Sequence, residues 1–270
     1  MSEKQDLLNL TGRIHQLVDY GIVTVDELNQ IKSFCNDEIS RLNSSEFIER
    51  AEIDWNDYKI REQSTNHEID AGTAMDMTNA FSKSDDIAGV YKEILHISYE
   101  VATDLFKNNT KVKIFIGADK YGLVFLYEDE NKNEYYILDN KLAKEKIIKD
   151  EFDNYKKTYN DGLKSILDAL IRRYDPVTSN TERFILYDTF YAELVRLKPK
   201  YPNLVISFHP AMHVSDDLIE VVRDDGTSFK ANYNHRLTFI MILGYYEGNK
   251  FIPISGLGAY DRNGLCPPGC

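Results

Sequence analysis

The sequence predicts an α+β fold, in which a helical N-terminal region precedes an antiparallel sheet with a packed pair of helices. Three observations lead to this prediction. Apolar residues recur at helical spacing through residues 1–110, the period changes to alternation at Lys111, and helical spacing returns between two β-rich stretches. Because strands and helices do not alternate regularly, a doubly wound or barrel fold is not expected.

Residues 1–110 are expected to form an acidic helical region. Helical spacing of apolar side chains predicts three helices before residue 61, followed by a loop with a short helix around Met75–Phe81. Ser84 is expected to cap one further helix, whose broad apolar side extends to Phe106. The chain is therefore divided into a helical region, 1–110, and an α+β domain, 111–270.

Residues 111–139 are predicted to form a three-stranded antiparallel meander. Alternating side chains over 112–116, a turn at Gly117–Lys120 and a polar turn at 128–133 separate the three strands.

The helical pair is expected within residues 141–198. A stripe of apolar side chains over 148–170 predicts one long helix. Ser179 and Glu182 fit a capping box that opens a second helix, which ends before Pro199. The short link between the two helices predicts that they pack antiparallel, as an αα-hairpin does.

Residues 204–255 are β-rich and precede a tail, 256–270. Hairpin turns are expected at Asp224–Thr227 and Glu247–Lys250. We expect this block to pair with the 111–139 strands in one sheet. The candidate strands cover 204–208, 218–222, 228–231, 237–246 and 251–254.

The negative charge is concentrated at one end of the chain. The net charge is −12, and residues 1–110 hold −11 of it. Such a field repels nucleic-acid phosphates and attracts basic partners. No stretch of about twenty apolar residues is present, and the polar N-terminus does not resemble a signal peptide. We therefore expect a cytoplasmic protein that binds a basic protein surface, and neither nucleic acid nor a membrane.

Two histidines near the end of the 204–208 strand are the candidate catalytic residues. Alternation places Val205, Ser207 and His209 on the same side of that strand, with His213 following. With Asp216, these histidines could act as a general base with its orienting acid, or bind a divalent metal. A structural role in a turn is the alternative, because Pro210 is typical turn material and argues against a helix that would align the two histidines.

The C-terminal tail ends in Cys266-Pro267-Pro268-Gly269-Cys270. Its two thiols could join His209, His213 or His235 in a metal site, form a disulfide or react with another molecule. A silent end is the alternative, since the spacing is not that of common zinc knuckles.

Three functions remain open at this point. The first is a protein-binding or regulatory protein of the inhibitor, immunity or adaptor type, which uses the acidic helical surface. The second is a metal- or thiol-dependent enzyme with a His/Asp/Cys site in the β-rich part. The third is a protein whose tail is recognised or modified by a partner. Motifs that would name a reaction, such as Gly-x-Ser-x-Gly or a phosphate-binding loop, are absent from the sequence.

Overall fold

The structure is a computed structural model in which most residues after 67 are described. Residues 1–67, with their three predicted helices, lie outside the described part, as do the turn at 224–227 and residues 261–270. The chain divides into two units, 1–51 with 248–251 and 52–247 with 252–270, and the elements discussed below, part of β12 excepted, belong to the second. The described residues are 68–139, 143–171, 179–215, 218–222, 228–248, 250–255, 257 and 259–260.

Helices and antiparallel strands are interleaved along the described chain. Up to residue 139 the elements are β1 (Glu68–Ile69), α3 (Ala71–Ser82), the 3₁₀ turn η1 (Gly89–Lys92), β2 (Leu95–Ser98), α4 (Tyr99–Phe106), β3 (Lys111–Asp119), β4 (Gly122–Asp129) and β5 (Glu134–Asp139). The later elements are β6 (Ala143–Ile147), α5 (Lys149–Tyr159), the π-helical turn η2 (Asn160–Lys164), α6 (Ser165–Ile171), β7 (Arg183–Tyr187), α7 (Asp188–Leu197), β8 (Leu204–Met212), β9 (Leu218–Val222), β10 (Ser228–Asn232), β11 (Leu237–Glu247), β12 (Lys250–Pro253) and β13 (Ala259–Tyr260).

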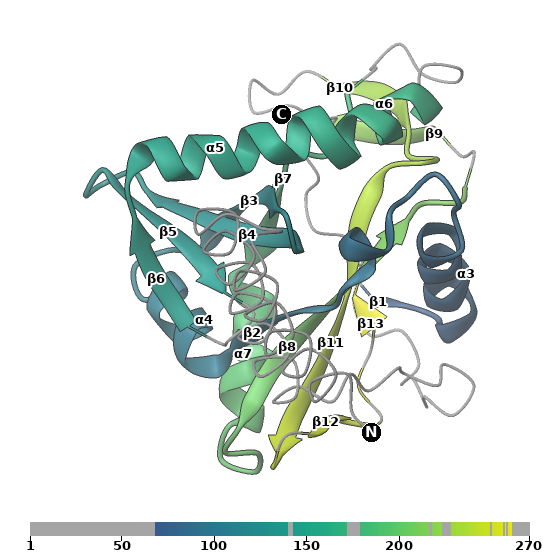
Figure 1. Ribbon diagram of the computed structural model, residues 1–270. Coiled ribbons are helices and arrows are strands. Elements are labelled where there is room, and N and C mark those ends of the chain that lie inside the picture. The colour runs from purple at the N-terminus through teal and green to yellow at the C-terminus, as the bar shows by residue number, and fades with distance from the viewer. Residues whose placement is uncertain are drawn as a thin grey trace, which may run out of the picture. The chain divides into compact units, whose positions relative to one another are not determined.

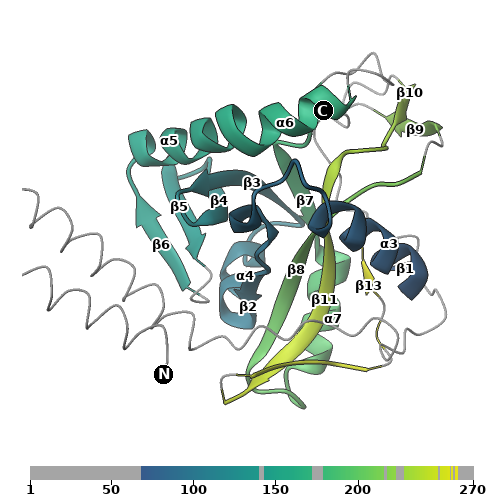
Figure 2. The same cartoon turned by 45° about the vertical axis from the view of Figure 1, so that its right-hand side comes forward.

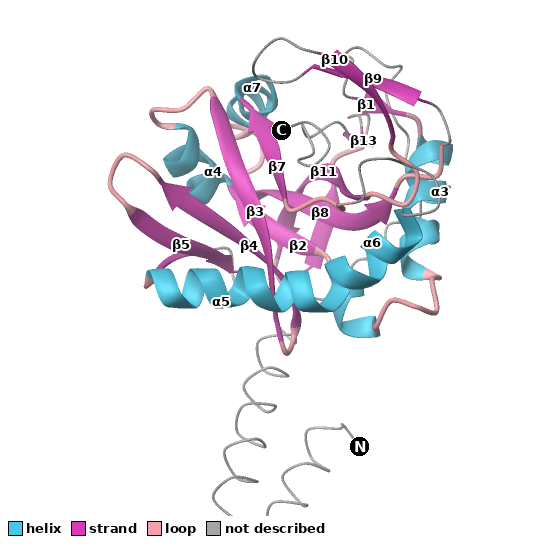
Figure 3. Cartoon of the chain, turned by 90° about the horizontal axis from the view of Figure 1, so that it is seen from above, coloured by secondary structure: helices cyan, strands magenta, loops and turns pink. Residues whose placement is uncertain are grey.

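The predicted meander forms most of the first sheet, whose strand order is β6-β5-β4-β3-β7. Its first turn is held by Asp119, whose carboxylate accepts hydrogen bonds from the backbone N–H groups of Tyr121 and Gly122. The long helix predicted over 148–170 is present as α5, η2 and α6, and it runs along one face of this sheet (Figures 1 and 3). Phe152 and Tyr155 of α5 pack there against Phe115 and other apolar side chains of the sheet.

The second sheet has the order β1-β13-β11-β8-β2. Every residue of β8 is buried, which is the pattern of a strand covered on both faces. On one face, Ala74 and Met77 of α3 pack against Ala211, Ile240 and other apolar side chains.

The two sheets meet through a cluster of four phenylalanines. The Phe125 ring of β4 lies edge-on to three others, at centroid distances of 4.9 Å to Phe208, 5.0 Å to Phe239 and 5.2 Å to Phe184. All four rings are fully buried. Such edge-to-face contacts stabilise a core beyond the area that they bury, so this cluster joins β4 and β7 to β8 and β11.

The α+β class is therefore confirmed, but the expectation of one continuous sheet was wrong. The strands of 111–139 and the strands β8 and β11 belong to separate antiparallel sheets that share a core, while β9 and β10 form a further two-stranded sheet. Because β8 is buried on both faces, it packs against α3 on one side and against the first sheet on the other. The two sheets are therefore stacked face to face and are not joined edge to edge.

The helix predicted from Ser84 to Phe106 was also wrong. The four residues of β2 are all buried and pair with β8, and the helix α4 begins only after Ser98, whose side chain caps it. Periodicity misled because a short, fully buried strand carries apolar residues that fit helical spacing equally well. The short helix around Met75–Phe81 lies within α3, as predicted.

The second helix of the predicted pair begins later than expected, at Asp188. Ser179 and Glu182 do contact each other, at 3.4 Å, but they precede the strand β7 and do not open a helix. Phe184 and Leu186 alternate with more exposed residues and face the core. The αα-hairpin is consequently absent from the described residues: β7 separates the two helices, and α7 lies beside α4 (Figure 2).

Residues 68–106 share the hydrophobic core of the later elements, since β2 pairs with β8 and Phe81, Leu95 and Leu105 belong to the same cluster as Phe125. The separation of a helical region thus stays a prediction for residues 1–67. Across the described ranges, the helices are too short or too polar to cross a membrane.

We predict that Gly122→Ala destabilises the protein by about 2 kcal/mol or more. Gly122 has a φ of 146°, and a Cβ added to it would lie 2.3 Å from the Val90 backbone oxygen. Gly89→Ala is the matched control, because a Cβ there meets nothing within 4 Å. Chemical denaturation measures both free energies of unfolding. Equal values for the two variants would show that the close approach of η1 and β4 is unimportant.

Candidate functional site

A chain of hydrogen bonds between polar side chains lies buried in the second sheet. His96 on β2 is the cross-strand partner of Ser207 on β8, and His209 follows two residues later on the same side of the strand. Tyr246 contributes from β11. Tyr246, His96, Ser207 and His209 are called the histidine–serine chain below. The prediction that Ser207 and His209 share a side of the strand is confirmed by their contact.

The distances in the histidine–serine chain are those of ordinary hydrogen bonds. The Tyr246 hydroxyl lies 2.9 Å from His96 Nδ1, and His96 Nε2 lies 3.1 Å from Ser207 Oγ. Ser207 Oγ in turn lies 2.9 Å from His209 Nε2. Three strands are thus joined through side chains, in addition to their backbone ladders.

Burial keeps the members of this chain uncharged near neutral pH. It lowers the pKa of His96 to about 4. For His209, burial and the neighbouring His96 lower the pKa to about 3. Burial also raises the pKa of Tyr246 to about 12. At pH 7 the four groups therefore form a neutral series of donors and acceptors, because burial disfavours the charged forms of the imidazoles and of the phenol.

The chemistry open to Ser207 is limited by its burial. A serine hydroxyl 2.9 Å from a histidine nitrogen has the spacing of a nucleophile and its base. However, Ser207 is fully buried and His209 is only 4% exposed, so a substrate cannot reach the hydroxyl in this conformation. The arrangement is therefore suited to joining strands.

His209 does not lie at the end of its strand, as the sequence suggested. The strand continues through Pro210 to Met212, and Pro210 is paired with Phe239 of β11. A proline is tolerated there because β2 reaches only as far as Phe208.

The structure also does not bring His209 and His213 together. Four residues of extended chain place their Cα atoms about 13 Å apart. His209 Nε2 is directed to Ser207, on the side away from His213, and the His213 ring packs edge-on against Tyr233. Groups of three or more histidine, cysteine or acidic residues that could hold a metal are absent from the described ranges.

Asp216 and the tail residues Cys266, Pro267, Pro268, Gly269 and Cys270 lie outside the described residues. A site that combines them with His209, His213 or His235 stays a prediction.

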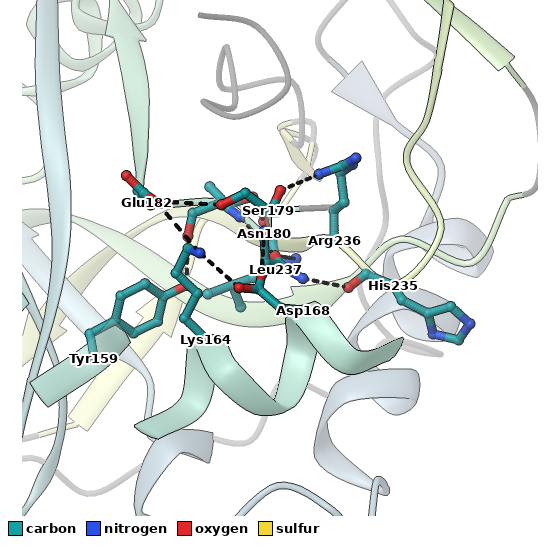
Figure 4. A network of polar contacts seen from close by, with 10 residues as sticks. Tyr159, Lys164, Asp168, Ser179, Asn180, Glu182, His235, Arg236 and Leu237 are labelled. Atoms are coloured by element: carbon teal, nitrogen blue, oxygen red, sulfur yellow. Dashed lines mark hydrogen bonds and ion pairs between the residues drawn. The ribbon is translucent and has the colours of Figure 1, made fainter. Parts of the chain in front are cut away.

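A second buried cluster, shown in Figure 4, surrounds the loop before β7. Lys164 is placed by the π-helical turn η2, and its side chain is only 9% exposed. Its ammonium group lies 2.9 Å from an Asp168 carboxylate oxygen and 3.5 Å from Glu182. Asp168 also accepts a hydrogen bond of 2.5 Å from the backbone N–H of Asn180. A buried cation is tolerated at this place because two carboxylates balance it.

Asn180 connects this loop to the start of β11. Its side-chain oxygen accepts hydrogen bonds from the backbone N–H groups of Thr181 and Leu237, both at 2.8 Å. Its amide donates to the His235 carbonyl at 3.0 Å. The Thr181 hydroxyl donates to the Leu237 carbonyl at 2.7 Å. Together these bonds fix the loop before β7 against the turn before β11.

The turn before β11 contains a left-handed residue and a fully buried arginine. His235 has a φ of 62°, and its imidazole points away from the cluster (Figure 4). Arg236 donates from Nε to the Asn232 carbonyl at 2.9 Å and from Nη1 to the Ser179 carbonyl at 2.7 Å. This second cluster therefore secures an unusual backbone turn through charged and amide side chains.

Sequence reasoning identified only part of these two clusters. It paired Ser207 with His209 but missed His96 and Tyr246, which the fold brings in from two other strands, β2 and β11. The Lys164–Asp168 pair has the (i, i+4) spacing of a helical ion pair, a signal that the sequence offers.

We predict that Asn180→Ala destabilises the protein by about 3 kcal/mol or more, because buried backbone groups of Thr181, His235 and Leu237 lose their partner. Asn154→Ala, on the exposed side of α5, is the control and should change stability by less than about 0.5 kcal/mol. Thermal or chemical unfolding measures both. A small effect at Asn180 would show that the loop is held by other contacts.

We predict that acid destabilises the fold through the two buried histidines. Their pKa values are depressed in the folded state, so the unfolded chain binds more protons below the ordinary value of 6.5. The stability that each neutral histidine contributes is complete above that value, and it is lost as the pH falls toward about 4 for His96 and about 3 for His209. Between about pH 6 and about pH 5, each histidine contributes a slope of about 1.4 kcal/mol per pH unit.

His209→Gln should remove one histidine's share of that slope, measured by denaturation at a series of pH values. A slope equal to that of the unmodified protein would contradict the neutral, buried state of His209.

Comparison with known proteins found no match for this chain among protein-family models, curated proteins or solved structures.

Proposed function

We propose that this protein binds a protein partner with a basic surface, as inhibitor, immunity and adaptor proteins do. The acidic contact surface is supplied by residues 1–110. One observation carries the proposal: these residues hold −11 of the net charge of −12, and the rest of the chain is almost neutral. An imbalance of this size in one region attracts an oppositely charged surface and speeds its association.

The described part of this region contributes to the imbalance. Residues 68–110 contain eight acidic and three basic residues. Asp76 on α3 and the adjacent Asp85 and Asp86 are exposed, and none of them forms an ion pair with another described residue. Their charge is thus available to a partner.

Unlike these three, Glu100 and Asp104 form ion pairs with Lys198 and Lys144, and acidic residues later in the chain resemble these two. Many of them form ion pairs with a nearby lysine, as Asp153 does with Lys149 and Glu134 with Lys146, both at 2.5 Å. Such pairs neutralise the surface locally, which fits the near-zero net charge of residues 111–270.

An enzyme with a site in the β-rich part is the second candidate. The contact between Ser207 and His209 is the observation that favours it, since a hydroxyl beside an imidazole is a common basis of nucleophilic catalysis. The burial of Ser207 places this function second. The metal- and thiol-dependent versions, which involve Asp216 or the tail cysteines beside the histidines, stay predictions.

We predict that the triple variant Asp76→Asn, Asp85→Asn, Asp86→Asn binds its partner about tenfold more weakly, because three attractive charges are lost. The full chain is used as bait in a lysate of its own source cells, and captured proteins are quantified by mass spectrometry at low and high salt. Capture of a basic protein should fall both with salt and with the triple variant.

The control variant removes the same charge elsewhere, through Glu130→Gln, Glu145→Gln and Glu247→Gln. These exposed residues lie on or beside β4, β6 and β11. This variant should capture the partner as well as the unmodified chain does. Capture that withstands high salt and is equal for both variants would overturn the proposal.

A further inference from the structure

The Ser207 hydroxyl lies between two histidines and can donate its hydrogen to only one of them. Its oxygen lies within hydrogen-bond distance of His96 Nε2 and His209 Nε2, and a hydroxyl has one hydrogen to donate. If one ring nitrogen accepts that hydrogen, the other ring nitrogen must donate to the oxygen. In the neutral chain, one Nε2 atom is therefore protonated and the other is not.

Tyr246 determines the direction of hydrogen-bond donation along the histidine–serine chain. Its hydroxyl lies 2.9 Å from His96 Nδ1, and a phenol is a better donor than acceptor. Donation by Tyr246 leaves the hydrogen of His96 on Nε2, from which it is donated to Ser207. Ser207 then donates to His209 Nε2, so that the hydrogen of His209 lies on Nδ1.

We propose that the Ser207 hydroxyl holds His96 and His209 in opposite tautomers, and that the histidine–serine chain accepts one proton while intact but a second only by separating β2 from β8. This acid-sensitive latch goes beyond the proposed binding function and does not depend on it.

The histidine–serine chain can bind a first proton without losing any of its hydrogen bonds. This proton binds at His96 Nδ1, and the Tyr246 oxygen changes from donor to acceptor by rotation of its O–H bond. His96 Nε2 still donates to Ser207, and Ser207 still donates to His209. The histidine–serine chain gains one proton in this step, and every other hydrogen stays on the atom that carried it.

The second proton does not fit. At His209 Nε2 it would point at Ser207 Oγ, which already accepts from His96 Nε2. The serine hydrogen would lose its acceptor in a buried place, and two imidazolium rings would adjoin one oxygen atom at 3.1 and 2.9 Å. An unsatisfied donor and two like charges are both strongly unfavourable in a buried site.

The opening is expected between β2 and β8 because the contact of His96 with Ser207 crosses that junction. The ladder between these strands has four residue pairs, whereas β8 and β11 share nine. The shorter ladder is the weaker one, so it separates first.

Few other ionisable groups of the described residues face this pair. Tyr246 is the ionisable residue of β11 that faces the two histidines. The strands β2 and β8 carry no ionisable residue besides His96 and His209. On α3, which covers the adjoining part of the same face, Ala74 and Met77 point to the sheet and Asp76 is exposed. On α4, the exposed Glu100 pairs with Lys198.

The tautomers are tested by nitrogen NMR of the full chain labelled at histidine, near neutral pH. The expected result is a hydrogen on Nε2 of His96 and on Nδ1 of His209. Ser207→Thr keeps the hydroxyl and should keep this pattern. The same tautomer in both rings would overturn the proposal.

The latch is tested by amide hydrogen exchange during acidification. Exchange of residues 95–98 should rise at least tenfold when the second histidine takes up its proton, while residues 111–119 of β3 stay protected as an internal reference. In His209→Gln the side-chain oxygen still accepts from Ser207 and takes up no proton, so β2 should remain closed at the same pH. Opening of β2 in this variant at the unchanged pH would overturn the latch.

Discussion

The position of β8 between β2 and β11 is the constraint on which both the phenylalanine cluster and the histidine–serine chain depend. One face of this strand carries Phe208 into the ring cluster that joins the two sheets. The opposite face carries Ser207 and His209, whose hydrogen bonds connect the three strands. Because β8 is covered on both faces, polar side chains on it must find partners within the protein, and the histidine–serine chain supplies them.

Local patterns in the sequence predicted the meander and the long helix, because alternation and helical spacing are strong over those lengths. They failed at β2, where a short run of buried residues fits either period, and at β7, where Phe184 and Leu186 alternate over only five residues. Ser207 and His209 were placed together by the geometry of one strand. His96 and Tyr246 were missed because their contacts depend on how distant strands pair, which a single sequence does not specify.

The two buried clusters and the acidic surface have different consequences for function. Lys164, Asp168 and Asn180 fix a loop against the turn that contains the left-handed His235. The histidine–serine chain is neutral at pH 7 and fixes three strands. Both therefore rigidify the β-rich part, whereas the exposed carboxylates of Asp76, Asp85 and Asp86 belong to the surface that we propose for partner binding. A rigid body that presents a charged region is suited to recognition, since less order must be gained on binding.

A hydrogen-exchange footprint of the full chain bound to its captured partner locates the contact surface. If residues 1–110 form it, protection appears there, including the segment with Asp76, Asp85 and Asp86, and weakens as salt is added. Protection confined to residues 204–260, or independent of salt, would contradict the account.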